Sequence, residues 1–222
     1  MEIFLYLIPF VLVLGAQAIV SSTYNKYKVV DNEKKVTGFD VARQILDKNG
    51  LKDIMIIETK GTMTDHYDPT RKTVKLSSEV YHEATISAMA IAAHECGHVI
   101  QHKDKYQLMM IRNAIVPFVN FASRIGYIVL VIGFLASAFN LAILGIVLLC
   151  ATLLFQLITL PVEFDASSRA IIILSKEHLI DKNEKSGVEN MLKAAAFTYV
   201  ASLLSNLLEI LRLFLMANRR RD

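Results

Sequence analysis

The chain has 222 residues, a formal net charge of +3 and a hydrophobic content of 54%, above the ~45–50% of ordinary soluble domains. The apolar excess lies in blocks, which predicts an integral membrane protein. The small charge gives nucleic-acid binding little support, and two cysteines, Cys96 and Cys150, make a disulfide framework implausible.

The first apolar block, Ile3 to Val20, approaches the length needed to cross the ~30 Å hydrocarbon core of a bilayer. A cleavable signal peptide is the alternative, since Ala16-Gln17-Ala18 imitates a cleavage site. Signal peptides begin with positive charge, however, whereas the early charged residue here is Glu2. The basic residues follow the block: Lys26, Lys28, Lys34 and Lys35. Residues 1–22 are therefore expected to be an uncleaved anchor whose C-terminal side is cytoplasmic.

A polar region with mixed secondary structure follows. Thr37–Gly50 reads as a helix that stops at Asn49-Gly50, and the isoleucine-rich Asp53–Thr59 reads as a strand. Thr64–Ser78 reads as two extended segments joined by an Asp68-Pro69 turn, which predicts a hairpin. Ser77 or Ser78 would cap the next helix, so that this helix follows directly on the hairpin.

That next helix contains the pattern H-E-x-x-H within "AMAIAAHECGHVIQH". His94 and His98 are one turn apart, so both imidazoles can converge on one ion, and Glu95 can polarise a zinc-bound water. The alternative is an amphipathic helix with two surface histidines. The apolar flanks favour burial instead, and buried histidines need partners that a metal supplies. Composition gives chance odds for this motif on the order of one per cent.

Two histidines leave a catalytic zinc site incomplete, because such sites use three protein ligands. The metzincin position for a third histidine holds Asp104, and His102 lies a further ~6 Å along the helix axis. The third ligand is therefore expected from another part of the chain.

The longest uncharged stretch runs from Ile125 to Pro161. One helix of that length would measure about 55 Å, too long for a single crossing, so a transmembrane hairpin is predicted with its turn near Asn140. With the N-terminus outside, three crossings return the chain to the side of His94.

The stretch ends in "LPVEFDASSRA", where Pro161 is expected to break or kink the helix. Two readings of the carboxylates that follow are open. In the first, Glu163 and Asp165 are simply interfacial carboxylates that end a span. In the second, Glu163 is the third metal ligand and its polar neighbours orient the ligands.

A fourth apolar block, Ala194–Ala217, contains Glu209 and Arg212, which at i, i+3 can neutralise one another. The block either spans the membrane or lies against it. Tyr199, at its start, is a candidate for stabilising an oxyanion.

The passages "TDHYDPTRKTVKLS", "AIAAHECGHVIQH", "LPVEFDASSRA" and "LKAAAFTYVA" together resemble the bacterial membrane zinc metallopeptidases of the YugP type. More distantly, the chain is similar to the gluzincin proteases HtpX and the CAAX prenyl endopeptidases, which carry H-E-x-x-H and then E-x-x-A-D. Matching the second motif to "EFDAS" makes Glu163 the ligand and puts Ser167 where the family has an aspartate. Asp165 is expected to take over part of that role.

The resemblance implies a mainly α integral membrane protein with a small α+β zincin-like catalytic domain. The expected segments are an anchor (1–22), the zincin-like domain (23–112), a transmembrane hairpin (113–161), a third-ligand helix (162–193) and a C-terminal hydrophobic helix with a basic tail (194–222). The strand Thr73, Val74, Lys75 and Leu76 would be the edge on which a peptide substrate pairs.

The resemblance also implies the chemistry. One Zn²⁺ per chain, held by His94, His98 and Glu163, would hydrolyse peptide bonds with Glu95 as general base. The expected partners are the lipid bilayer and a peptide or protein substrate, with no nucleic acid. The expected location is a bacterial plasma membrane, with the catalytic side cytoplasmic.

Two alternatives remain at this point. A site-2-type intramembrane protease would place the motif in a span, but the apolar run before His94 is short, from Ile86 to Ala93. A non-catalytic zinc-binding scaffold would not require Glu95.

Overall fold

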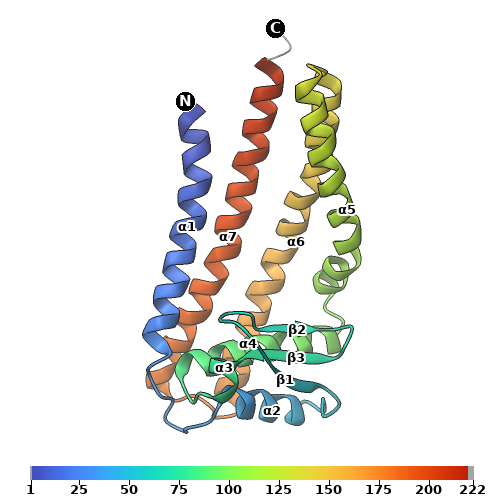
Figure 1. Cartoon of the computed structure of the whole chain (residues 1–222). Coiled ribbons are helices and arrows are strands. Elements are labelled where there is room, and N and C mark those ends of the chain that lie inside the picture. The colour runs from blue at the N-terminus through green and yellow to red at the C-terminus, as the bar shows by residue number, and fades with distance from the viewer. Residues whose placement is uncertain (1, 220–222) are drawn as a thin grey trace. The chain divides into compact units, whose positions relative to one another are not determined.

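The computed structural model describes residues 2–219 and is mainly helical (Figure 1). The helices are α1 (Glu2–Tyr27), α2 (Gly38–Lys48), α3 (Ser78–His82), α4 (Ile86–Lys103), α5 (Gln107–Leu135), α6 (Phe139–Lys176) and α7 (Lys182–Arg219). The strands are β1 (Met55–Thr59), β2 (His66–Asp68) and β3 (Thr73–Ser77).

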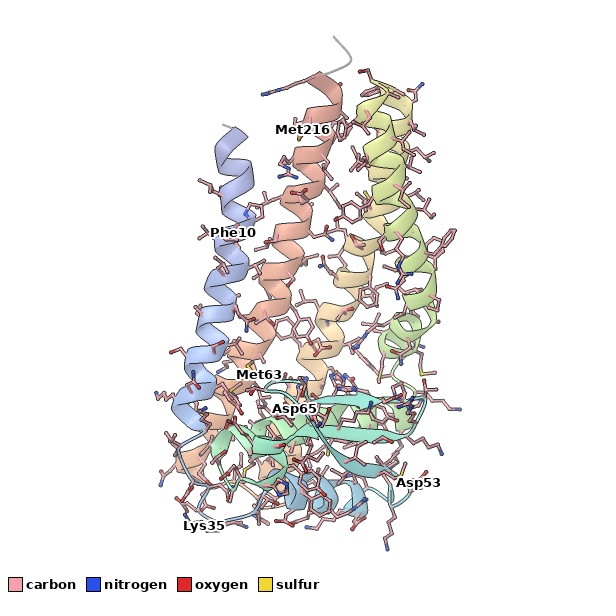
Figure 2. The ribbon with its side chains drawn as sticks, viewed as in Figure 1. Phe10, Lys35, Asp53, Met63, Asp65 and Met216 are labelled. Carbon is pink, nitrogen blue, oxygen red and sulfur yellow. The ribbon has the colours of Figure 1, made fainter. Side chains whose placement is uncertain are left out.

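Among the described residues, four helices, α1, α5, α6 and α7, are long and apolar enough to cross a membrane. Their surfaces carry large apolar side chains such as Phe10, labelled on α1 in Figure 2, which is 62% exposed. In water such exposure would be unfavourable, whereas in a bilayer lipid tails cover it. The mainly α membrane architecture predicted from the sequence is confirmed at this level, and the C-terminal block belongs to a fourth candidate span.

The described chain divides into two compact units. The helical unit comprises residues 2–17, 107–161 and 197–219. The sheet unit comprises residues 18–106 and 162–196 and includes all three strands. Each unit has its own apolar core, built in the helical unit around Leu130, Ile146 and Leu149 and in the sheet unit around α2 and α4.

Two helix boundaries in the transmembrane segments differ from the sequence prediction. The turn between α5 and α6 lies at residues 136–138, with Ser137 at a φ of 51°, so that Asn140 is already inside α6. Pro161 does not end α6, which continues to Lys176. A proline removes one backbone hydrogen bond of a helix, and in a helix this long the bonds on either side maintain it. Arg212 and Glu209 form the expected ion pair on α7.

The first helix that lies wholly in the sheet unit is α2, whose start is fixed by a capping box between Thr37 and Asp40. The strand order of the sheet is β1-β3-β2, in which β1 is parallel to β3 and β2 is antiparallel to it. The hairpin predicted for Thr64–Ser78 is therefore confirmed.

The prediction that Thr73–Leu76 form an edge strand is wrong. Thr73, Val74 and Lys75 of β3 pair with β1 on one side and with β2 on the other. The parallel partner β1 occupies the side that a substrate would have needed, so the open edges of the sheet belong to β1 and β2.

The hairpin does not lead directly into the motif helix. The short helix α3 intervenes, and Thr85, not Ser77 or Ser78, caps α4 by accepting a hydrogen bond from Ala88 N. The Ser77 hydroxyl instead donates to Asp65, labelled in Figure 2, which also accepts the Ser77 backbone N–H at 2.7 Å.

Candidate metal centre

The histidine pair lies on α4, a helix rich in small apolar residues and therefore buried over most of its length. His94 and His98 are one turn apart, and their rings meet edge to face with 4.8 Å between centroids. His98 is buried and His94 is half-buried. The helix thus presents two imidazoles side by side, as the i, i+4 spacing predicts.

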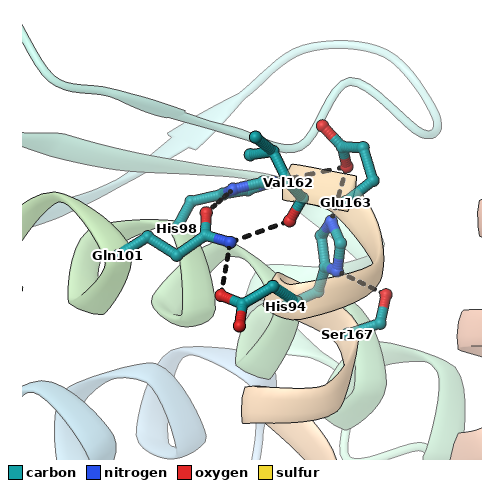
Figure 3. Close-up of polar contacts among 7 residues, drawn as sticks. His94, His98, Gln101, Val162, Glu163 and Ser167 are labelled. Carbon is teal, nitrogen blue, oxygen red and sulfur yellow. Dashed lines mark hydrogen bonds and ion pairs between the residues drawn. The ribbon is translucent and has the colours of Figure 1, made fainter. Parts of the chain in front are cut away.

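Glu163 comes from α6 and is buried at 2% exposure. Its Oε2 lies 3.3 Å from His94 Nε2 and 3.4 Å from His98 Nε2 (Figure 3). One ligand atom from each of the three residues can be chosen so that all lie within 4.8 Å of one another. The structure therefore brings Glu163 to a pair of histidines that is far from it in the sequence.

These distances fit a zinc ion. Zinc–nitrogen and zinc–oxygen bonds of about 2.0–2.1 Å in a tetrahedron put neighbouring ligand atoms about 3.3 Å apart. The two measured Nε2–Oε2 separations, 3.3 and 3.4 Å, match that edge length. Two imidazoles and a carboxylate are also a ligand set of catalytic zinc sites, which leave the fourth position open.

The other ring nitrogen of each histidine has a partner that turns Nε2 toward Glu163. Ser167 Oγ lies 3.2 Å from His94 Nδ1, and Gln101 Oε1 lies 2.9 Å from His98 Nδ1 (Figure 3). An Nδ1–H that donates to either oxygen leaves the Nε2 lone pair for a metal.

Gln101 is the residue that the sequence analysis missed. It is completely buried, and its amide nitrogen donates to Val162 O and to Asp165 Oδ2, both at 2.8 Å. These two bonds fix the amide so that its oxygen faces His98. Gln101 therefore connects the histidine helix to α6, and it links Asp165 to His98.

Asp165 is in turn held by a cation. Arg169 donates from Nε to Asp165 Oδ2 and from Nη1 to Asp104 Oδ2, both at 2.6 Å. Asp104 is the C-terminal cap of α4. Arg169 thus ties the end of the histidine helix to the segment that carries Glu163.

Gly97 allows the two helices to come close enough. A Cβ at this position would lie 2.6 Å from Ala166 O on α6, which is closer than real Cβ atoms approach. Only a glycine fits there without displacing backbone. Gly97 lies between the two histidines, so the point of close contact between α4 and α6 is part of the H-E-x-x-H motif itself.

Glu95 stands beside His94 and is buried at 7% exposure. Burial raises the pKa of its carboxyl, against the opposing effect of the two histidines. No hydrogen bond joins its carboxylate to another described residue, so its oxygens remain available as acceptors for a water. A raised pKa suits a group that accepts and returns a proton.

Cys96 and Tyr199 are not assigned as metal ligands. Cys96 is fully buried, its Sγ is 3.7 Å from Ala42 O, and burial raises the pKa of its thiol, as befits a packing residue. Tyr199 belongs to the helical unit, so its part in an oxyanion site stays a prediction.

A protein family and a known protein both match this chain over nearly its whole length. Residues 2–218 match the family described as "Putative neutral zinc metallopeptidase". A Bacillus subtilis (strain 168) protein named "Putative membrane protease YugP" is 46% identical over 220 residues, which cover 99% of this chain and 98% of that protein. No solved structure matches the chain.

Proposed function

The chain belongs to the neutral zinc metallopeptidase family, and from that premise we propose that it is a membrane-bound endopeptidase whose His94, His98 and Glu163 bind one zinc ion. The observation that carries the proposal is the placement of Glu163 Oε2 at 3.3 and 3.4 Å from the two Nε2 atoms. A YugP relative named as a membrane protease supports the location and the reaction class.

A zinc ion held by His94, His98 and Glu163 would supply a Lewis acid and would make water more acidic, with a pKa toward ~7. Glu95 accepts the proton of the attacking water, and the water oxygen forms a bond to the scissile carbonyl carbon. Glu95 then gives that proton to the leaving nitrogen as the C–N bond breaks. Ser167 and Gln101 keep the ligand imidazoles oriented throughout. Tyr199 is proposed as a second group for the developing oxyanion.

The substrate is proposed to pair with β2 as an added strand. β2 is a free edge of the sheet, and Tyr67 on it bonds through its hydroxyl to His102 Nδ1, 2.9 Å away, on the helix that carries both histidines. Main-chain hydrogen bonds to such an edge hold a peptide extended and orient its scissile bond.

The active site is proposed to face the cytoplasm of a bacterium. Lys26 lies in the last turn of α1, and Lys28, Lys34 and Lys35 follow the helix, so the positive-inside tendency places that end of the anchor inside. The helix α4 is not among the candidate spans, which favours cleavage outside the hydrocarbon core over a site-2-type reaction.

The decisive experiment separates the enzyme from a zinc-binding scaffold. Glu95→Gln should keep one zinc per chain and lose hydrolysis of a casein or peptide substrate, whereas Glu163→Ala should lose zinc as well. Glu83→Gln, an exposed carboxylate before the same helix, is the matched control and should keep both. Full hydrolysis by Glu95→Gln, or undiminished zinc in Glu163→Ala, would disprove the assignment.

A further inference from the structure

The helical unit contains a cavity of about 380 Å³ between α5, α6 and α7. Its polar lining residues come from all three helices, and α6 also carries Glu163. They are Asn120 and Ser123 on α5, Thr152, Gln156 and Thr159 on α6, and Tyr199 and Ser202 on α7. None of the described residues that line the cavity is charged. Polar side chains gathered within candidate membrane spans are costly, so they indicate a site that binds something polar.

The polar groups of the cavity are held in place but retain hydrogen-bonding capacity. The hydroxyls of Thr159 and Ser202 donate to carbonyls of their own helices, which leaves their oxygens as acceptors. Asn206 on α7 donates to Thr152 Oγ1 at 2.9 Å and to Gln156 Oε1 at 2.8 Å, which joins α7 to α6. The side-chain oxygen of Gln156 therefore already accepts a hydrogen bond, and its NH₂ group can donate hydrogen bonds to a ligand.

Asn120 supplies the second observation. Its side chain is exposed, lines the cavity and has no hydrogen-bond partner among the described residues. An amide offers two donors and an acceptor, and leaving them unmade in a bilayer is unfavourable. Asn120 therefore needs a partner that neither lipid tails nor the described part of the chain provides.

From this geometry we infer that the cavity binds a short extended stretch of a substrate's backbone at the point where a membrane-embedded segment is unwound. Unwound backbone presents alternating neutral donors and acceptors, which must be satisfied inside a bilayer. The amides and hydroxyls around the cavity match both kinds of group. This inference rests on the proposed function and names its substrate class: proteins with a helix-breaking sequence in a transmembrane segment.

The lining chemistry disfavours a lipid as the occupant. A phosphate headgroup binds best to Arg or Lys, and neither occurs among the lining residues in the described part of the chain. An acyl chain would make no use of the amides and hydroxyls. A neutral peptide backbone uses the whole set.

The test measures binding in the Glu95→Gln background, so that no peptide is consumed. The full chain in phosphatidylcholine nanodiscs is titrated with a fluorescent single-span peptide carrying Gly-Pro at its centre, and with the same peptide carrying Leu-Leu there. We expect the Gly-Pro peptide to bind about tenfold more tightly, and Asn120→Leu to remove about that factor, the value of one or two hydrogen bonds. Asn140→Leu, on α6 outside the cavity lining, should not change the affinity.

Equal affinity for the two peptides, or an unchanged affinity in Asn120→Leu with native zinc content and unfolding temperature, overturns the inference. So does native mass spectrometry in which Asn120→Leu removes a bound phospholipid and leaves peptide binding intact. The proposed function fails separately: if the protein with Glu95 binds the Gly-Pro peptide as expected but cleaves no peptide, the cavity inference stands and the peptidase assignment falls.

Discussion

Gly97 lies directly against the backbone carbonyl of Ala166, which a Cβ on Gly97 would approach to 2.6 Å. This contact joins the helix with the two histidines to the helix with Glu163, and it occurs between the two histidine positions. The ligand geometry therefore depends on a residue that has no side chain.

Gly97→Ala should separate the two helices and weaken zinc binding. The added methyl group meets backbone, which cannot rotate away, so we expect a destabilisation of about 1–3 kcal/mol and a lower zinc affinity. Zinc content after dialysis against a competing chelator, together with the unfolding temperature, measures both effects. Gly15→Ala on α1 is the control, since its Cβ would meet nothing within 4 Å. Equal zinc retention in the two variants would contradict the packing argument.

Gln101→Leu should lower zinc affinity without touching a ligand. The substitution removes the acceptor for His98 Nδ1–H and leaves Val162 O without its donor. Loss of such an orienting partner typically costs about 10–100-fold in metal affinity. Competition with a fluorescent zinc chelator measures the change, and the exposed Gln107→Leu is the control. An affinity within twofold of the control would remove Gln101 from the orienting role.

Ser167 tests whether the hydroxyl that faces His94 Nδ1 contributes to zinc binding. Ser167→Ala removes the group that faces His94 Nδ1 and should weaken zinc binding. Ser167→Asp should restore or increase it, because a carboxylate acceptor makes the imidazole a stronger ligand. The neighbouring exposed Ser168→Ala should behave like the unmodified chain. Zinc affinity that falls in Ser167→Asp as far as in Ser167→Ala would show that the position needs a hydroxyl.

Asp65 should make the stability of the sheet unit depend on pH. Burial raises the pKa of this carboxyl, although its hydrogen bonds from Ser77 act in the opposite direction. A carboxyl whose pKa is higher in the folded state contributes most when protonated, so its contribution falls as pH rises from its unfolded pKa through its folded pKa. Asp65→Asn, which keeps the acceptor oxygen, should gain stability over the unmodified chain across that window.

The unfolding midpoints of Asp65→Asn and of the unmodified chain, measured in detergent at several pH values from acid to neutral, give the pH dependence of the stability difference. The exposed Asp53→Asn is the control and should show no such trend. A difference between Asp65→Asn and the unmodified chain that is constant with pH would refute the burial effect.

The parts of the centre that follow from local rules were predictable from sequence. The side-by-side placement of His94 and His98 follows from helix periodicity. Counting membrane crossings predicted only that Glu163 lies on the same side as His94, and its choice as the third ligand rested on the resemblance to proteases with H-E-x-x-H followed by a glutamate. Gln101 was not predictable, because its role depends on the Val162 carbonyl and Asp165, which reach it only through tertiary packing. The central position of β3 escaped prediction for the same reason, since its pairing with β1 joins residues that are not neighbours in a hairpin.

The contrasting burial of the two cysteines has a practical consequence. Cys96 is enclosed in the core beside the histidines, whereas Cys150 is exposed on α6. A membrane-permeant maleimide dye added to the folded protein should therefore attach at Cys150 and not at Cys96, and it should report on α6 from its apolar section. Reaction at Cys96 should begin only when the sheet unit unfolds. The rate at which a second equivalent of dye is incorporated would therefore measure the unfolding of the metal centre, and no engineered residue is needed.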